Sequence, residues 1–149
     1  MTREQVTELV RSAKRKSGKS WKDIAAAINP QISPIIVTAA LLGQMTLTPD
    51  EADKAVSLLG LPAECALLLA EIPYRGSIPA MPPTDPLIYR FYELVMVYGT
   101  SFKELIQEEF GDGIMSAIDF DMVMERQPDP KGDRVKLSMS GKFLPYKRY

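Results

Sequence analysis

The segment from Leu87 to Tyr98 constrains the fold of this chain most, because it predicts a helix that is apolar nearly all round. Arg90 and Glu93 are its only charged residues, and their spacing places both on one face of the helix. Such a helix is normally buried on all sides. A small domain cannot easily cover it alone, so we expect a second subunit to cover it.

Two interpretations of Arg90 and Glu93 are open at this point. A buried ion pair often only breaks even in stability against apolar residues of the same size, so a functional role is the first. The second is a structural ion pair that holds an oligomer in register.

Composition excludes several classes of protein. The chain has 149 residues, which suits one ordinary domain or two small ones. Lys and Arg number 18 against 19 Asp and Glu, so no net charge attracts nucleic acid or an anionic membrane. No apolar run has the length of a membrane span. Cys65 is the only cysteine, which excludes an internal disulfide and fits a cytoplasmic location.

The chain contains no histidine, and this limits the chemistry that it can perform. Histidine is the commonest general base and metal ligand, so a histidine-based triad is excluded and a zinc site is not expected. We therefore predict no metal and look to Arg, Lys, carboxylates, Ser, Tyr and backbone amides. We expect Cys65 and Trp21 to be core residues.

The first seventy residues predict a run of short helices, each bounded by capping or helix-ending residues. Thr2 with Gln5 forms a capping box, and Thr48 with Glu51 forms another. The predicted helices occupy residues 2–18, 20–29, 33–43, 48–60 and 62–70.

The second and third of these helices resemble a helix-turn-helix in a phage-repressor-like bundle. A basic cluster supports DNA binding, and it consists of Arg11, Lys14, Arg15, Lys16, Lys19 and Lys22. However, the would-be recognition helix begins Pro34-Ile35-Ile36-Val37-Thr38, without the Arg, Asn, Gln or Lys that read base edges. A helical packing module with a solvated basic face is the alternative, and we do not expect a nucleic-acid partner.

A proline-dense connector separates two predicted domains, with limits at 1–75, 76–86 and 87–149. Proline fixes φ and opposes both helix and central strand, so this segment is extended. Asp85-Pro86 then begins the apolar helix, which we expect to end at Gly99. Ser101 with Glu104 predicts a further helix up to Phe110.

The tail predicts an antiparallel hairpin, because apolar and polar residues alternate from Ile118 to Glu125 and again from Val135 to Met139. The turn-rich segment 128–133 lies between them. A lone two-stranded hairpin is marginal in water, which again favours an oligomer.

The segment Gly111-Asp112-Gly113 precedes this hairpin, with Ser116 at the start of the strand. Two glycines allow the backbone to present consecutive N–H groups, which can bind an anion. The simpler interpretation is a loop that contains a glycine at the helix C-terminus.

Several segments together resemble the cyanase family, whose members are also called cyanate hydratases or cyanate lyases. The resemblance covers nearly the whole chain in order and spacing. The segments that carry it are Val37–Gln44, Thr84-Asp85-Pro86, Tyr89-Arg90-Phe91-Tyr92-Glu93, Val97-Tyr98-Gly99, Phe110–Ile114, Ser116-Ala117-Ile118 and Gly141-Lys142-Phe143-Leu144-Pro145.

The resemblance implies that Arg90, Glu93 and Ser116 are the catalytic residues, and that Ala117 and Leu144 contact substrate. It implies a reaction of cyanate with bicarbonate that yields ammonia and carbon dioxide through carbamate, and so detoxifies cyanate. It also implies that no metal or organic cofactor is used, and that intertwined dimers assemble into a homodecamer.

We therefore expect a mainly α protein with a small α+β C-terminal domain. Its N-terminal part would be a helix-turn-helix-like bundle, and its C-terminal helix and antiparallel strands would carry catalysis and dimerisation. The alternative is a non-catalytic helix-turn-helix DNA-binding regulator with a C-terminal dimerisation domain.

Overall fold

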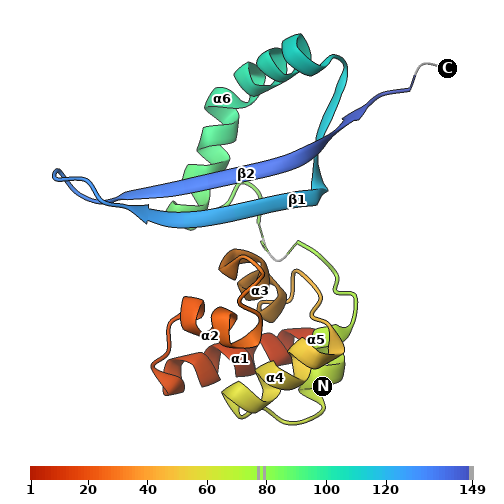
Figure 1. The fold of residues 1–149 in the computed structure, drawn as a ribbon, viewed down its shortest axis with the longest axis vertical. Helices are drawn as coiled ribbons and strands as arrows, with labels where there is room; N and C mark the ends of the chain where they lie inside the picture. The colour runs from red at the N-terminus through yellow and green to blue at the C-terminus, as the bar shows by residue number, and fades with distance from the viewer. Residues whose placement is uncertain (77, 79, 148–149) are drawn as a thin grey trace. The chain divides into compact units, whose positions relative to one another are not determined.

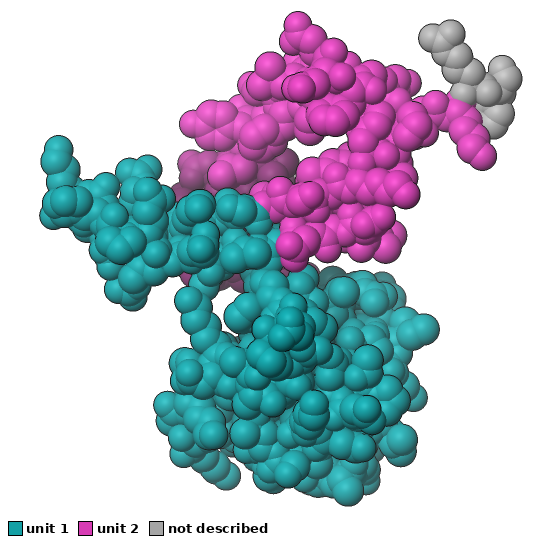
Figure 2. Space-filling view, viewed as in Figure 1, with its two compact units in different colours: residues 1–77, 122–138 teal, residues 78–121, 139–149 magenta. Residues whose placement is uncertain are grey.

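The computed structural model describes residues 1–76, 78 and 80–147, which form six helices and one two-stranded hairpin (Figure 1). The fold class predicted from the sequence is confirmed. The chain divides into two compact units, residues 1–77 with 122–138 and residues 78–121 with 139–149 (Figure 2). This division does not decide the predicted domain limits, which remain a prediction.

Five helices make up the helical part of the first unit, which we call the helical unit. Their ends follow the capping signals in the sequence. Capping boxes begin three of them, at Thr2, Ser20 and Thr48, while left-handed glycines end two of them, at Gly18 and Gly60. The helices are α1 (Arg3–Ser17), α2 (Trp21–Ile28), α3 (Pro34–Leu41), α4 (Pro49–Leu59) and α5 (Cys65–Ala70).

One apolar core holds these helices together, and every one of them contributes to it. Trp21 packs partly buried against this core, and Cys65 is fully buried in it, as predicted. The core residues are Val6, Val10, Ile24, Ala25, Ile28, Val37, Ala40, Leu41, Leu47, Ala52, Ala55, Leu59, Cys65 and Leu69.

A polar contact to a buried carboxylate ties the end of α2 to the first turn of α4. Asn29 ends α2, and its Nδ2 donates to Glu51 Oε1 over 2.7 Å. Glu51 also accepts from the backbone N–H of Thr48 and so completes the capping box of α4. These hydrogen bonds, the one from Asn29 first, lower the pKa of Glu51.

Helix α3 is used for packing along much of its length. Val37, Ala40 and Leu41 are buried in the core. Ser33 precedes α3 but makes no capping hydrogen bond there; its hydroxyl donates instead to the Met122 carbonyl over 2.7 Å, within the same unit. This arrangement agrees with a packing module.

Helix α6 (Pro86–Phe110) is one continuous helix, so the predicted break at Gly99 and the separate helix from Ser101 are wrong. Asp85 caps it by accepting from the N–H groups of Leu87 and Ile88. Gly99 lacks the positive φ of a C-terminal glycine, and a glycine inside a helix costs only about 1 kcal/mol. The helix ends instead at Gly111, whose φ is 91°.

The predicted hairpin is present and consists of β1 (Gly113–Gln127) and β2 (Arg134–Pro145). Both strands extend further than the alternating pattern indicated, so Ser116 lies inside β1 rather than at its first residue. Lys136 of β2 pairs with Glu125 of β1 at 3.2 Å, and Arg126 of β1 pairs at 3.0 Å with Asp133, which directly precedes β2.

Candidate active site

Arg90 and Glu93 lie one turn apart on α6 and form an ion pair, with Arg90 Nη1 2.9 Å from Glu93 Oε2. The guanidinium carbon of Arg90 is 5.7 Å from the centroid of the Tyr89 ring. Within a single chain the two side chains are 64% and 46% exposed. The burial expected for this pair is therefore not provided by its own chain.

No residue of α6 is buried within the chain. The exposed residues include nearly every large apolar side chain of the helix, so its apolar surface is open along its whole length. They are Leu87, Ile88, Phe91, Leu94, Val95, Met96, Val97, Tyr98, Phe102, Leu105 and Phe110. A continuous apolar surface of this kind is typical of a protein interface.

Ser116 is the polar residue of β1 that the chain does bury, with only 5% of its surface exposed. Its Oγ accepts hydrogen bonds from the backbone N–H groups of Ile118 and Asp119, each over 3.0 Å. A serine hydroxyl has two acceptor lone pairs and one donor proton. Both acceptor positions are therefore filled, and the hydroxyl proton is left to donate to another group.

The two amides that hold Ser116 were not found by sequence reasoning. The N–H groups of Ile118 and Asp119 both donate to the serine hydroxyl. Nothing in the sequence distinguishes an amide that binds the serine hydroxyl from one that binds an anion, because both use the same backbone groups.

The other two predicted site residues lie on the hairpin strands. Ala117 is exposed next to Ser116 in β1. Leu144 lies in β2 with its side chain 42% exposed, and its carbonyl faces Gly113. The structure thus joins Arg90 to Glu93 directly, whereas no hydrogen bond links either residue to Ser116 within the described part of one chain.

The Gly111-Asp112-Gly113 segment joins α6 to β1. Gly111 ends α6, and the Asp112 carbonyl accepts from the Tyr146 N–H over 3.0 Å. Beside it, the rings of Phe110 and Phe143 are 5.4 Å apart. The helix-ending role of Gly111 is confirmed, and anion binding by this segment remains a prediction.

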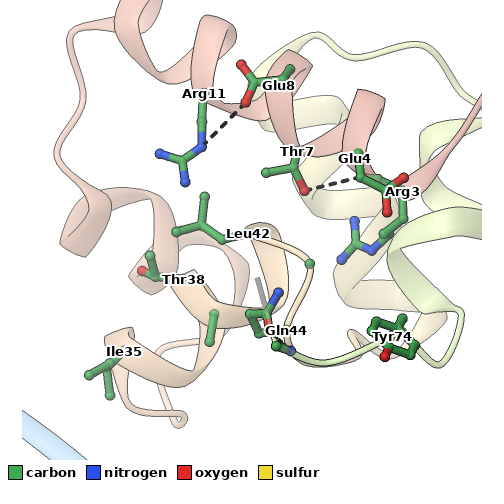
Figure 3. A pocket seen from close by; sticks show the side chains of 13 residues that line it. Arg3, Glu4, Thr7, Glu8, Arg11, Ile35, Thr38, Leu42, Gln44 and Tyr74 are labelled. Carbon is green, nitrogen blue, oxygen red and sulfur yellow. Dashed lines mark hydrogen bonds and ion pairs between the residues drawn. The ribbon is translucent and has the colours of Figure 1, made fainter. Parts of the chain in front are cut away.

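A cavity of about 660 Å³ lies in the helical unit beside α1 and α3 (Figure 3). Arg3 is at its edge and donates through Nη2 to the Ala40 carbonyl. Among the described residues, nothing pairs with its buried Nε and Nη1, and burial lowers the pKa of Arg3. None of the predicted site residues lines this cavity, so it is separate from the candidate active site.

No group of three Cys, Asp or Glu side chains that could hold a metal ion occurs within residues 1–76, 78 and 80–147. The predicted absence of a cofactor remains a prediction. The described helices include none with the length and apolar character needed to cross a membrane.

Two family models of known proteins match the N-terminal and the C-terminal parts of the chain. A family model described as the N-terminal domain of cyanate hydratase matches residues 3–73. A second model, described as the cyanate lyase C-terminal domain, matches residues 80–148.

Individual relatives match over the full length. The cyanate hydratases of Ralstonia pickettii (strain 12J) and Dechloromonas aromatica (strain RCB) are 60% and 57% identical to this chain, with complete coverage of both sequences. The crystal structure of cyanase from T. urticae is similar with a TM-score of 0.81 at 38% identity, over 94% of this chain and 96% of that one. These matches do not favour the DNA-binding regulator.

Proposed function

The chain belongs to the cyanate hydratase family and is an enzyme of the lyase class, and on that premise we propose that it decomposes cyanate with bicarbonate as the second substrate. Bicarbonate attacks the cyanate carbon to give a dianionic carboxycarbamate. Loss of carbon dioxide then leaves carbamate, which breaks down to ammonia and a second carbon dioxide. The balanced reaction takes up two protons for each cyanate consumed. This reaction would detoxify cyanate.

The main obstacle to this reaction is that both substrates are anions. The protein must hold two like charges together, and holding reactants in position can itself supply several kcal/mol of barrier reduction. Because bicarbonate is the nucleophile, no activated side chain is needed. A chain without histidine, whose lone Cys65 is buried in the helical core, is suited to such a mechanism.

Arg90 is the proposed binding group for the anions. A guanidinium is planar, permanently charged and matched to two oxygens of a carboxylate-like group. Glu93 accepts from Nη1 and fixes the orientation of the side chain, which leaves the other N–H groups of Arg90 for substrate. Glu93 is thus proposed to orient Arg90, and proton transfer is a secondary role for it.

Ser116 is proposed to donate a hydrogen bond from its hydroxyl to the negative charge that develops in the reaction. Its acceptor positions are filled by two amides, so the oxygen is oriented as a donor toward an anion. Fixed donors of this kind are typically worth about 3 kcal/mol each. Ala117 and Leu144, which lie on the same two strands, are proposed to line the substrate position.

A second copy of this chain is the proposed cover for α6. The helix leaves its apolar side chains exposed, and Ile118, two residues after Ser116, is 98% exposed. Both features are expected where strands and helices of two chains intertwine. Resemblance to the family extends this proposal to a homodecamer built from such dimers.

The active site is proposed to lie between chains. One Arg90 cannot balance the two charges of the carboxycarbamate, whereas two copies from different chains can. The simplest arrangement places them around a shared site on or near a symmetry axis. Glu93 and Ser116 would then also come from more than one chain. No metal or organic cofactor takes part in this scheme, and the proposed location is the cytoplasm.

The observation that carries the proposal is the match to cyanate hydratases along the entire chain. The experiment is an initial-rate assay of ammonia release from cyanate in carbon dioxide-free buffer, with and without added bicarbonate. A sample without protein corrects for spontaneous cyanate hydrolysis. We expect release only with bicarbonate, whereas equal rates in both buffers would contradict the proposal.

The DNA-binding alternative is tested separately by titrating labelled duplexes at physiological salt. We expect no sequence-specific binding, because α3 buries apolar residues in the core and begins without side chains that read base edges. Tight binding to one sequence that resists competitor DNA, in a protein without cyanate turnover, would support the regulator instead.

A further inference from the structure

The two strands of the hairpin come very close together at Gly141, which faces Ser116. A Cβ atom added to Gly141 would clash with the Ser116 carbonyl oxygen and would lie 2.6 Å from Met115 Cγ. Non-bonded heavy atoms normally stay beyond about 3 Å. The Met115 side chain could turn away, but the carbonyl can move only if the Ser116 backbone moves with it.

Gly113 makes the reciprocal approach from β1 to β2. A Cβ atom there would clash with the Leu144 carbonyl oxygen and would lie 2.5 Å from Phe143 Cζ. Neither Gly113 nor Gly141 has a positive φ. The two positions therefore need glycine for space and not for backbone freedom, and they mark two close approaches of the same pair of strands.

The close approach of Gly141 constrains the backbone of Ser116, whose hydroxyl is already held by other groups. The Ser116 Oγ is fixed by the amides of Ile118 and Asp119, which belong to the same strand. These amides set the direction of the hydroxyl within β1, but they do not set the position of β1. The approach of β2 at Gly141 supplies that second constraint.

We propose that Gly141 is a positioning residue for the cyanate reaction, which acts by letting β2 pack against the Ser116 backbone and so fixes where the hydroxyl donates. This inference rests on the proposed role of Ser116. Gly141 itself has no side chain with which to touch substrate, so its effect must pass through Ser116.

The test is a double-mutant cycle between Gly141→Ala and Ser116→Ala in the full-length, assembled protein. A misplacement of about 1 Å can cost about 100-fold in rate, so we expect Gly141→Ala to lower kcat by about that factor. In the Ser116→Ala background the same substitution should cost little more. Ser140→Ala, an exposed neighbour on β2, is the matched control and should keep full activity.

A second readout avoids dependence on weak residual turnover. Calorimetric titration with oxalate, a small dianion, should show weaker binding to Gly141→Ala than to the unsubstituted protein. No further weakening is expected when Ser116 is already Ala. A purely structural role would reduce kcat and oxalate affinity by the same factor in both backgrounds, and that result would overturn the inference, as would full activity of Gly141→Ala.

If Gly141→Ala does not assemble, Gly113→Ala tests the packing of the same two strands at their second close approach, to Leu144 and Phe143, with the same cycle and the same expected result. Failure of both variants to assemble would count against the inference, because the contact would then serve folding. Absence of bicarbonate-dependent turnover in the unsubstituted protein would instead contradict the proposed function.

Discussion

Arg90 donates to Glu93 over 2.9 Å although both side chains are open to solvent in the single chain. An exposed ion pair contributes only about 0–1 kcal/mol to stability. Stability of the lone chain therefore does not explain why two charges interrupt an otherwise apolar stretch. The proposed role, in which Glu93 fixes the orientation of a guanidinium for anion binding, explains it better.

Replacing Arg90 by Lys tests this role of the guanidinium. The substitution keeps the positive charge but loses the planar fork, so the barrier to turnover should rise by about 2–4 kcal/mol. Steady-state kinetics on the purified, assembled variant measures this change. Arg126→Lys is the matched control, because Arg126 also pairs with an acid, Asp133, and should tolerate the exchange. Near-native turnover of Arg90→Lys would remove Arg90 from the mechanism.

The proposed site between chains predicts a particular binding ratio. If two copies of Arg90 surround one site, oxalate as a mimic of the dianionic intermediate should bind at about half a molecule per chain. It should also raise the melting temperature, because it binds only the assembled state. Calorimetric titration gives the ratio directly. One oxalate per chain, with unchanged affinity in a dissociated variant, would show that each chain carries a complete site.

Cys65 should be dispensable for turnover. Its thiol is fully buried in the helical core, with Sγ 3.6 Å from Met1 Sδ, and burial raises the pKa of the thiol. Cys65→Ser should keep turnover per assembled oligomer, while burial of a hydroxyl should cost about 1–3 kcal/mol of stability. Kinetics and thermal melting measure the two effects. Inactivity in a variant that melts normally would mean that a thiol takes part.

Glu51 should make the stability of the helical unit depend on pH. Hydrogen bonds from Asn29 and Thr48 lower its pKa below the ordinary value of 4.5. A carboxyl with a lowered folded-state pKa contributes stability above its unfolded pKa, and that contribution is lost as pH falls through the folded pKa. Glu51→Gln should therefore destabilise the protein by about 1–3 kcal/mol at neutral pH and by less in acid.

Urea unfolding followed by circular dichroism, repeated from pH 7 down to pH 3, measures this difference. Asp53→Asn is the matched control, because Asp53 is an exposed carboxylate on the same helix. A cost of Glu51→Gln that is the same at every pH would contradict the assigned pKa shift.

Local signals in the sequence predicted most helix ends. Thr2 and Thr48 form the expected capping boxes because their hydroxyls and the acids or amides three residues later satisfy free N–H groups. The hairpin followed from its alternating residues. Gly99 was misread, because a glycine inside a helix costs little when the residues on both sides favour the helix.

The site was less accessible to sequence reasoning. The spacing of Arg90 and Glu93 predicted their contact, since residues three apart meet on a helix. The filled acceptor positions of Ser116 could not be predicted, because they depend on how β1 turns after that residue. The space at Gly141 could not be predicted either, because it depends on a partner strand distant in sequence.

The exposed apolar length of α6 also bears on how this protein reaches its native state. A helix with no fully buried residue in its own chain gains little from folding before it meets a second chain. For the second unit, folding and association with another chain would then be one event, and its rate would rise with the concentration of chains. The helical unit has its own core and needs no such encounter. A newly made chain would therefore form its first five helices by itself and would form a stable α6 only after it meets a second chain.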